Sequence, residues 1–410
     1  MVRILSLRQA QPILQARTLR LTEAERAVGP IIEAVRKRGD RALLQYARRF
    51  DRLRGPLRLA GRDLRVVLPA PLRRAVTAAE ANIRRFAEWQ LPKPFVRRLP
   101  SGQIVGQIVR PLETVATYIP AGRYPLPSTL LMTAVPARVA GVPNICAACP
   151  NPSREILGIA SYLRLRLFFR MGGAHAIAAF AFGTDTVPKA DRIVGPGSIW
   201  VATAKKLLAG EVAIDFVAGP TEIVILADDG DPRVLAADML AQAEHDVDAS
   251  AIMVTTSRRL ATLVAAELER QLLTLPTAAI AAEALMRNSA IVAAGSLSAA
   301  MALVNRLAPE HLSIPTAALL EKVRNAGSVF IGSSSPEAAG DYATGPNHVL
   351  PTCGAARYRG GLSAADFVKV ISTQELTTGA LRRLAPAITT LARAEGLEAH
   401  ARSIEVRLDG

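Results

Sequence analysis

The chain has 410 residues, of which 50% are hydrophobic and 4% aromatic, and its formal net charge is +15. This length and hydrophobic fraction allow two or three domains with buried cores and exclude an intrinsically disordered chain. No uncharged apolar run reaches about 18 residues, and the first residues lack a signal-peptide pattern. We therefore expect a cytoplasmic protein with no membrane partner.

The excess of Arg and Lys is spread along the chain rather than gathered in one tail. A basic surface can bind nucleic acid, but the basic clusters contain no interleaved aromatic residues on which single strands would stack. We expect no nucleic-acid partner. The alternative from a different class of protein is a basic nucleic-acid-binding or scaffolding protein that has an enzyme fold but catalyses no reaction.

The first third of the chain predicts helices. Residues 21–50 place apolar side chains at helical spacing, and a second helix is expected over 71–89. From residue 114 the pattern changes to short apolar runs bounded by Gly and Pro, with Ala- and Leu-rich helical segments between them. Such runs lie at 114–119, 144–149, 166–171, 192–195, 213–219, 222–228, 251–257, 290–294 and 328–332. This alternation indicates α/β domains with mostly parallel sheets, and the chain after about 362 is again helical.

The chain has three cysteines, Cys146, Cys149 and Cys353. This small, odd number cannot form a disulfide framework, which fits a reducing compartment. Cys146 and Cys149 form one C-x-x-C pair inside an apolar run. A single pair is weak evidence for zinc or redox chemistry. Core packing at a strand end is the favoured interpretation.

The histidines are the most informative residues, because each lies in a polar, turn-rich or acid-flanked context. Gln242 and His245 are three residues apart, so on a helix they share one face and can reach the same ion. Nitrogen and oxygen donors are those of a catalytic zinc, and Asp341 and His400 are available donors in comparable settings. Polar pairs at this spacing are also common on solvated helices, and this alternative stays open.

Glu310 and His311 form a second acid and imidazole pair directly after Pro309. An extended or turn conformation there could place both side chains in a cleft. A neutral imidazole suits proton removal from an alcohol, and a neighbouring carboxylate can activate water. A helix-starting Glu followed by a partly buried His is the equally weighted alternative.

Two loops rich in Gly and Pro, YIPAGRYPLPST and IVGPGSIW, follow apolar strands. Open α/β sheets bind ligands at the carboxyl ends of their strands. Neither loop is a G-x-G-x-x-G motif, and no phosphate-binding loop of the G-x-x-x-x-G-K-[ST] type occurs. By themselves these loops indicate only functional segments.

Taken together, several long strings resemble the histidinol dehydrogenase family over residues 32–405. They are RGDRALLQYARRFD, YIPAGRYPLPSTLLMTAVPARVAGV, GTDTVPKADRIVGPG, AIDFVAGPTEIVILAD, DMLAQAEHD, NRLAPEHL, AGDYATGPNHVLPT and AEGLEAH. The resemblance implies a zinc-dependent, NAD-linked oxidation of L-histidinol through histidinaldehyde to L-histidine, with two NAD reduced. A family relative that oxidises another small amino alcohol or diol is the alternative.

The resemblance also implies roles for named residues. One zinc per subunit would be held by Gln242, His245, Asp341 and His400, and would anchor the imidazole and amino nitrogens of the substrate. His311 would be the general base, and Glu310 would activate the water that hydrates the aldehyde. The remaining expected substrate contacts are Thr221, His348 and Glu395. The family forms homodimers, so Glu395 and His400 would cross over and complete the partner's site.

The expected cofactor contacts are Tyr118, His175 and Ser198. At this region the family usually has GGAQAIAA, GPGN and YIPGG, whereas this chain has His175, Ser198 and Ala121. The usual Gln and Asn help to hold the nucleotide. A His can still donate a hydrogen bond, and a Ser can replace part of the role of an amide.

Pattern and resemblance together predict two incomplete Rossmann-like α/β domains with helical segments at both ends. We expect an N-terminal arm over 1–14, a first α/β domain from 15–117 and 223–361, and a cofactor-binding domain over 118–222. Residues 362–410 are expected to form a helical dimerisation segment.

Overall fold

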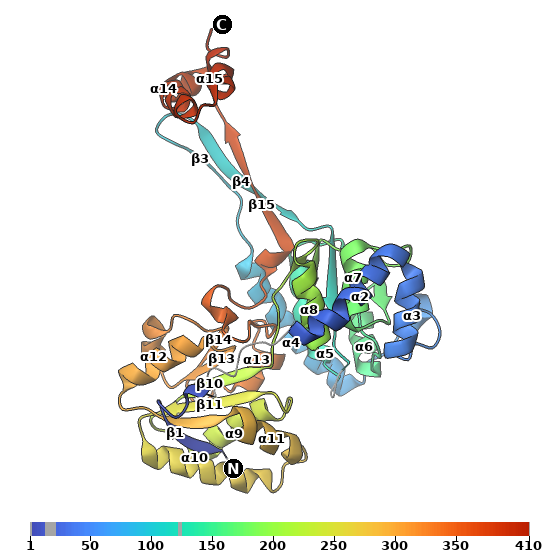
Figure 1. Cartoon of the computed structure of the whole chain (residues 1–410), viewed down its shortest axis with the longest axis vertical. Coiled ribbons are helices and arrows are strands. Elements are labelled where there is room, and N and C mark those ends of the chain that lie inside the picture. The colour runs from blue at the N-terminus through green and yellow to red at the C-terminus, as the bar shows by residue number, and fades with distance from the viewer. Residues whose placement is uncertain (1, 13–21, 122–124, 410) are drawn as a thin grey trace.

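The computed structural model describes residues 2–12, 22–121 and 125–409. Two lobes, each built on a six-stranded sheet, lie side by side (Figure 1). A three-stranded ribbon projects away from them and carries the last two helices at its tip. The α/β fold with mostly parallel sheets is confirmed.

The first lobe has the strand order β2-β7-β6-β5-β8-β9, and all its pairs are parallel except β2 with β7. Its strands are β2 (Arg58–Leu59), β5 (Thr114–Tyr118), β6 (Asn144–Ala148), β7 (Leu167–Phe169), β8 (Arg192–Val194) and β9 (Ala213–Ile214). Its helices are α2 (Thr22–Arg38), α3 (Asp40–Phe50), α4 (Ala70–Gln90), α5 (Pro127–Val139), α6 (Arg154–Tyr162), α7 (Gly173–Phe182) and α8 (Ile199–Leu208). Strand order reverses between β5 and β8, which makes a crevice at the carboxyl ends there the expected ligand site.

The second lobe has the strand order β1-β12-β11-β10-β13-β14, with every pair parallel. Its strands are β1 (Arg3–Ser6), β10 (Glu222–Leu226), β11 (Ser250–Thr255), β12 (Ala290–Ala293), β13 (His311–Ile314) and β14 (Ser328–Ile331). Its helices are α9 (Pro232–Ala243), α10 (Arg258–Leu272), α11 (Ala278–Asn288), α12 (Leu297–Leu307) and α13 (Glu337–Tyr342). Helices cover both faces, so β10 and β11 are buried along their whole length.

The projecting ribbon has the antiparallel order β15-β4-β3. Its strands are β3 (Phe95–Arg98), β4 (Ile104–Pro111) and β15 (Val368–Glu375), and its tip carries α14 (Thr378–Ala394) and α15 (Glu398–Glu405) (Figure 1). The short 3-10 turns are η1 (Gly61–Leu64), η2 (Ala317–Lys322), η3 (Ala355–Arg357) and η4 (Ala364–Phe367). The expectation of helix after residue 362 was therefore wrong over β15, whose side chains are mostly exposed and give no periodic pattern.

The structure groups the first third of the chain differently from our expected domain division. Helices α2 and α3 pack on α7 and α8 in one apolar core, and β5 is central to the same sheet. This segment therefore belongs with 118–222 rather than with 223–361. Most of the expected N-terminal arm is described, and β1 within it adds a parallel strand to the second sheet.

The structure of the first lobe also tests two predictions about its helices and its cysteine pair. The helix expected over 21–50 is broken at Gly39, whose φ is +52°, while α4 confirms the second helix. Cys146 and Cys149 are fully buried at β6, and burial raises the pKa of both thiols to about 12. Core packing is thus confirmed for this pair.

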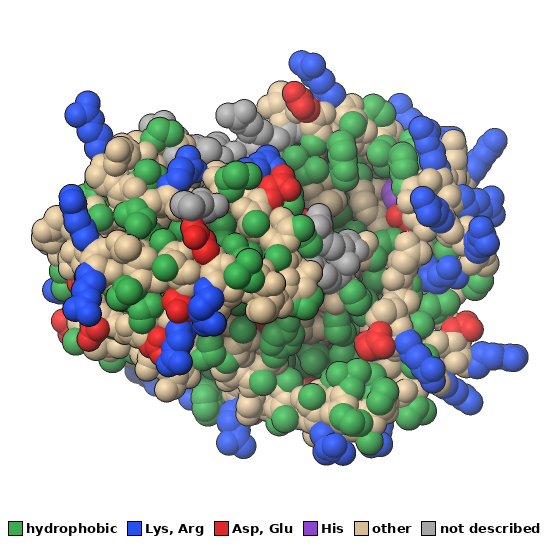
Figure 2. Space-filling view, turned by 90° about the horizontal axis from the view of Figure 1, so that it is seen from below, with side chains coloured by type: hydrophobic (Ala, Val, Ile, Leu, Met, Phe, Trp, Pro, Cys, Tyr) green, Lys and Arg blue, Asp and Glu red, His purple; other side chains and the backbone are tan. Residues whose placement is uncertain are grey.

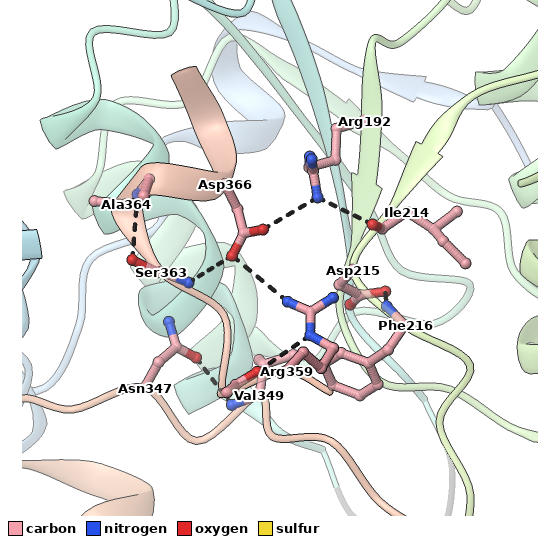
Figure 3. Close-up of polar contacts among 12 residues, drawn as sticks. Arg192, Ile214, Asp215, Phe216, Asn347, Val349, Arg359, Ser363, Ala364 and Asp366 are labelled. Carbon is pink, nitrogen blue, oxygen red and sulfur yellow. Dashed lines mark hydrogen bonds and ion pairs between the residues drawn. The ribbon is translucent and has the colours of Figure 1, made fainter. Parts of the chain in front are cut away.

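A polar cluster ties the segment before the ribbon to the first lobe (Figure 3). Arg192 on β8 contacts Asp366 at 3.3 Å and donates to the Ile214 carbonyl at 3.0 Å. Arg359 contacts the other oxygen of Asp366 at 3.6 Å and stacks over the Phe216 ring. These contacts fix the base of the ribbon against the sheet.

Charge and hydropathy on the outside are mixed. Figure 2 shows Lys and Arg side chains at both sides of one face, with hydrophobic and acidic side chains between them. Among the described residues, none of the helices combines the length and the apolar composition needed to cross a bilayer.

Candidate active site

The expected catalytic pair lies where two neighbouring strands of the second sheet begin. His311 opens β13 and is in register with Ile223 of β10, so residues 221–222 and 310–311 are adjacent. Glu310 Oε2 accepts a hydrogen bond from Thr221 Oγ1 at 2.6 Å and another from the Glu222 amide at 2.9 Å. Thr221, expected to contact substrate, thus donates directly to the Glu310 carboxyl group. These residues lie at amino ends of strands, where the carboxyl-end rule gives no guidance.

Glu310 and His311 are both nearly inaccessible, with 6% and 4% of their surfaces exposed. Burial raises the pKa of Glu310 to about 8, although the hydrogen bonds from Thr221 and Glu222 act in the opposite direction. Burial likewise lowers the pKa of His311 to about 4. At neutral pH the site therefore holds an uncharged imidazole and a carboxyl group poised to lose its proton.

The contacts of His311 select one tautomer. Its Nδ1 lies 3.2 Å from the Glu222 carbonyl oxygen, which can only accept a hydrogen bond. Nδ1 therefore carries the proton, and Nε2 has a free lone pair. Nε2 lies 4.0 Å from Asp341 Oδ1. This leaves Nε2 as the basic atom of the pair.

The side chains of three histidines lie around the Asp341 carboxylate. Its carboxylate oxygens lie 3.9 Å from His245 Nε2, 4.0 Å from His311 Nε2 and 3.8 Å from His348 Nδ1. His348 is partly buried, and burial lowers its pKa as well. His245 and Asp341, which the structure brings together, are 96 positions apart in the sequence.

His245 and Asp341 fit a shared metal ion. His245 Nδ1 donates to the Ala241 carbonyl at 2.9 Å, which fixes the ring and leaves Nε2 free. Such a backbone anchor on the second ring nitrogen is typical of metal-binding histidines. Two zinc bonds of about 2.0–2.2 Å can span the 3.9 Å between Nε2 and Asp341 Oδ2. Within the described residues, no group of three or more His, Cys, Asp or Glu side chains is arranged to hold a metal ion.

Sequence reasoning missed Glu337, which lies beneath this cluster. It is 4% exposed, and its Oε1 lies 3.4 Å from His311 Nδ1. Its carboxyl group also accepts a hydrogen bond from the Gln242 side-chain nitrogen, and the Gln242 amide oxygen accepts from the Glu222 amide at 3.2 Å. Burial, with Asp341 and Glu310 nearby, raises the pKa of Glu337 well above its usual value. Its position four residues before Asp341, on the same face of a helix, is the only sequence signal.

A cavity of about 360 Å³ opens next to these groups. Three of the expected site residues line it: His311, Asp341 and His348. Its other walls come from β14 and from the segment 334–350. The volume suits a small polar substrate, since ligand pockets range from about 300 to 1,000 Å³.

Glu395 and His400 are not at this cavity. Glu395 follows α14 and His400 lies in α15, both at the far tip of the ribbon (Figure 1). Within one chain, the structure therefore separates these two residues from the other expected site residues.

The expected cofactor residues surround the strand reversal of the first sheet. Tyr118 ends β5, and its hydroxyl accepts a hydrogen bond from the Gly173 amide at 3.2 Å. Gly195 follows β8 with φ at +113°, and a Cβ there would lie 2.2 Å from the Tyr118 carbonyl oxygen. Buried Lys205 and Asp215 hold this glycine through its carbonyl and amide. Tyr118 and Gly195 lie at the carboxyl ends of β5 and β8, where the strand order reverses and a ligand is expected in an open α/β sheet.

The three departures from the family pattern have different surroundings. Ser198 is exposed at the start of α8, and Ala121 pairs with Pro125 beside residues outside the described ranges. His175 is only 1% exposed, and its Nε2 lies 2.8 Å from Asp51 Oδ2. The direct nucleotide contact expected of His175 is therefore not what its position favours, because its ring faces the interior.

Comparisons with known proteins agree over nearly the whole length. The family model described as histidinol dehydrogenase matches residues 14–408. The chain belongs to the histidinol dehydrogenase family. Histidinol dehydrogenase from Geobacter metallireducens is 45% identical over 95% of this chain and 92% of its own length. The relative of the same name from Thermus thermophilus is 47% identical over 93% and 94%.

A solved structure gives the same result. The crystal structure of histidinol dehydrogenase from Elizabethkingia anophelis superposes with a TM-score of 0.95 at 34% identity, covering 100% of this chain and 98% of that one. An acetylating aldehyde dehydrogenase from Geobacillus thermoglucosidasius, with a TM-score of 0.50 and 13% identity, shares the fold alone. The chain is thus an oxidoreductase of the histidinol dehydrogenase family, as the sequence motifs predicted.

Proposed function

We propose that this enzyme oxidises L-histidinol through histidinaldehyde to L-histidine, with two NAD as oxidants and one zinc ion per subunit. The observation that carries this proposal is the cluster of His311, Glu310 and Asp341 beside a cavity of about 360 Å³. A neutral base, a water-activating acid and a metal-ligand pair are the groups that a two-step alcohol oxidation needs.

His311 serves as the base in the first oxidation. Its Nε2 accepts the hydroxyl proton of the alcohol while the carbon loses hydride. The proton on Nδ1 stays bonded to the Glu222 carbonyl, so the ring keeps its orientation as it becomes charged. Glu337 at 3.4 Å stabilises that charge when it is ionised, and holds the ring in place in either state.

Glu310 serves the second oxidation. As a carboxylate it removes a proton from water, which adds to the aldehyde carbon and gives the hydrate that is oxidised next. Thr221 and the Glu222 amide both donate to Oε2, which leaves Oε1 to face the water. These donors also stabilise the carboxylate form against the effect of burial.

The two groups that the structure does not contain have sites that fit them. When bound, NAD accepts hydride in each oxidation and zinc holds nitrogen atoms of the substrate. Tyr118 and the turns at Gly173 and Gly195 would receive NAD, with Ser198 at the exposed edge. Gln242, His245 and Asp341 of one subunit would hold zinc, and His348 would face the substrate from the cavity wall.

We also propose a homodimer in which the C-terminal segment enters the partner's site. The ribbon and its helices expose a series of large apolar side chains that a monomer leaves in water: Phe95, Val96, Val370, Ile371, Leu391, Leu397 and Val406. A partner lobe would cover them and would receive Glu395 and His400. The free thiols of buried Cys146 and Cys149 support the cytoplasm as the location.

The test is an assay of the full-length protein with histidinol and NAD. We expect two NADH per histidinol, loss of activity with a chelator and recovery with added zinc. Formation of one NADH with aldehyde as the end product would overturn the proposed sequence of steps. Turnover of another amino alcohol or a diol, with none of histidinol, would favour the alternative substrate.

A further inference from the structure

The turn between β7 and α7 is held by side chains from two distant segments. The Gly172 amide donates to Asp51 Oδ2 at 2.9 Å, and the Gly173 amide donates to the Tyr118 hydroxyl at 3.2 Å. Asp51 comes directly after α3, and Tyr118 ends β5. Both anchors therefore act on the same turn beside the proposed NAD crevice.

His175 completes the contact with Asp51. Its Nε2 lies 2.8 Å from the same Oδ2 that accepts from Gly172, so the ring nitrogen donates and the carboxylate oxygen accepts twice. His175 is 1% exposed, and Asp51 is 8% exposed. The Tyr46 and Phe50 rings flank the imidazole, with centroids at 6.1 and 6.2 Å. The pair is enclosed on the side away from the turn.

The turn itself has little freedom to move. A Cβ on Gly172 would lie 2.7 Å from Pro150 Cγ, and Gly173 has φ at +54°. Packing thus sets where the backbone runs, while the Asp51 carboxylate and the Tyr118 hydroxyl set where its two amides point. Asp51 and Tyr118 therefore orient two successive amides of a single turn.

We propose that Asp51 and His175 are positioning residues for NAD. They hold the turn at residues 172–173, and through it the Tyr118 hydroxyl, in the conformation that receives the nucleotide. His175 acts through Asp51 and does not touch NAD. This inference rests on the proposed NAD-linked function. A Gln at this position could also donate to the Asp51 carboxylate.

The experiment compares three variants of the full-length protein: His175→Gln, His175→Leu and Asp51→Asn. The dissociation constant for NAD is measured by calorimetry without substrate, together with kcat and KM and with hydrogen exchange of the peptide that contains residues 172–173. We expect His175→Gln to bind NAD within about twofold of wild type. His175→Leu and Asp51→Asn should bind about tenfold more weakly, with faster exchange and an unchanged KM for histidinol.

Thr133→Val is the matched control, since it removes a buried hydroxyl that donates to the Thr129 carbonyl within α5. It should lower the melting temperature and leave NAD binding unchanged. If His175→Leu lowers the melting temperature but binds NAD as wild type does, the inference is overturned and the pair is core packing only. If wild type itself binds no NAD, the proposed function fails first. Asp51→Asn preserves side-chain volume and supplies the comparison if His175→Leu does not fold.

Discussion

At the scale of single residues, burial determines what the catalytic pair can do. The same loss of solvent pushes the pKa of Glu310 up and that of His311 down, so both groups are largely uncharged at neutral pH. A base that is already neutral needs no activation. Glu310, in contrast, must lose its proton before it can activate water. We therefore expect the second oxidation to be the pH-dependent step.

We expect the rate of histidinaldehyde oxidation to rise with pH through about 8 and then to level off, because the working form of Glu310 is the carboxylate. The measurement is kcat with histidinaldehyde on both sides of this pKa. Glu310→Gln should abolish the rising limb and lower the rate by about 10² or more. An unchanged limb in that variant would assign the titration to another group.

Glu337 provides a second prediction at this scale. Glu337→Leu should lower the free energy of unfolding by about 1–3 kcal/mol, because it leaves the buried Gln242 amide without its partner. It should also weaken zinc binding and lower kcat. Glu337→Gln keeps the size and an acceptor oxygen for the Gln242 amide, and should recover most of the stability. Urea unfolding and zinc titration separate the two effects, and equal losses in both variants would contradict this role.

The residues that sequence reasoning located and missed differ in one respect. Glu310, His311, His245 and Asp341 stand in long family motifs, and the structure brings them together. Glu337 lies outside these motifs. It matters because it contacts Gln242 and His311, which are 95 and 26 positions away in the sequence. Spacing along one helix predicts neighbours on that helix only.

At the scale of elements, short buried strands bounded by Gly and Pro were predictable, and exposed ones were not. The runs at β5, β6, β10 and β11 are mostly apolar because helices cover both faces of their sheets. β15 and β3 are exposed along almost their whole length, so their sequences follow no burial pattern. The pairing of β15 with β4 depends on register across more than 250 residues, whereas β3 pairs with β4 locally.

A substitution at Gly195, directly after β8, tests the close packing at the end of a buried strand. Gly195→Ala would place a Cβ 2.2 Å from the Tyr118 carbonyl oxygen in a backbone with φ at +113°. We expect a loss of about 1–3 kcal/mol in the free energy of unfolding, together with weaker NAD binding. Gly210→Ala is the control, since no atom lies within 4 Å of its Cβ position. Equal stability of the two variants in urea would contradict the close approach.

At the scale of the whole molecule, the ribbon separates the two halves of the proposed zinc shell. His400 lies at its tip, and His245 and Asp341 lie in the second lobe (Figure 1). The resemblance supplied the expectation that His400 comes from the partner. The sequence alone could not, because donor chemistry is the same whichever chain provides the ligand.

Subunit mixing tests this arrangement. His245→Ala and His400→Ala should each be inactive as homodimers. When the two are mixed and reassembled, half of the dimers contain both chains, and each of these has one intact site, which gives about a quarter of wild-type activity. If the C-terminal segment returned to its own lobe instead, every site would lack one ligand and mixing would restore nothing.

The catalytic base and the walls of its cavity belong to parts of the molecule with different tolerance for change. His311 begins a strand that is hydrogen-bonded to neighbours on both sides, whereas much of the cavity wall comes from the irregular segment around 334–350. Insertions and exchanges are accepted far more readily in irregular surface segments than in central strands. The range of alcohols accepted can therefore diverge through that wall, while the proton-transfer chemistry stays fixed in the sheet.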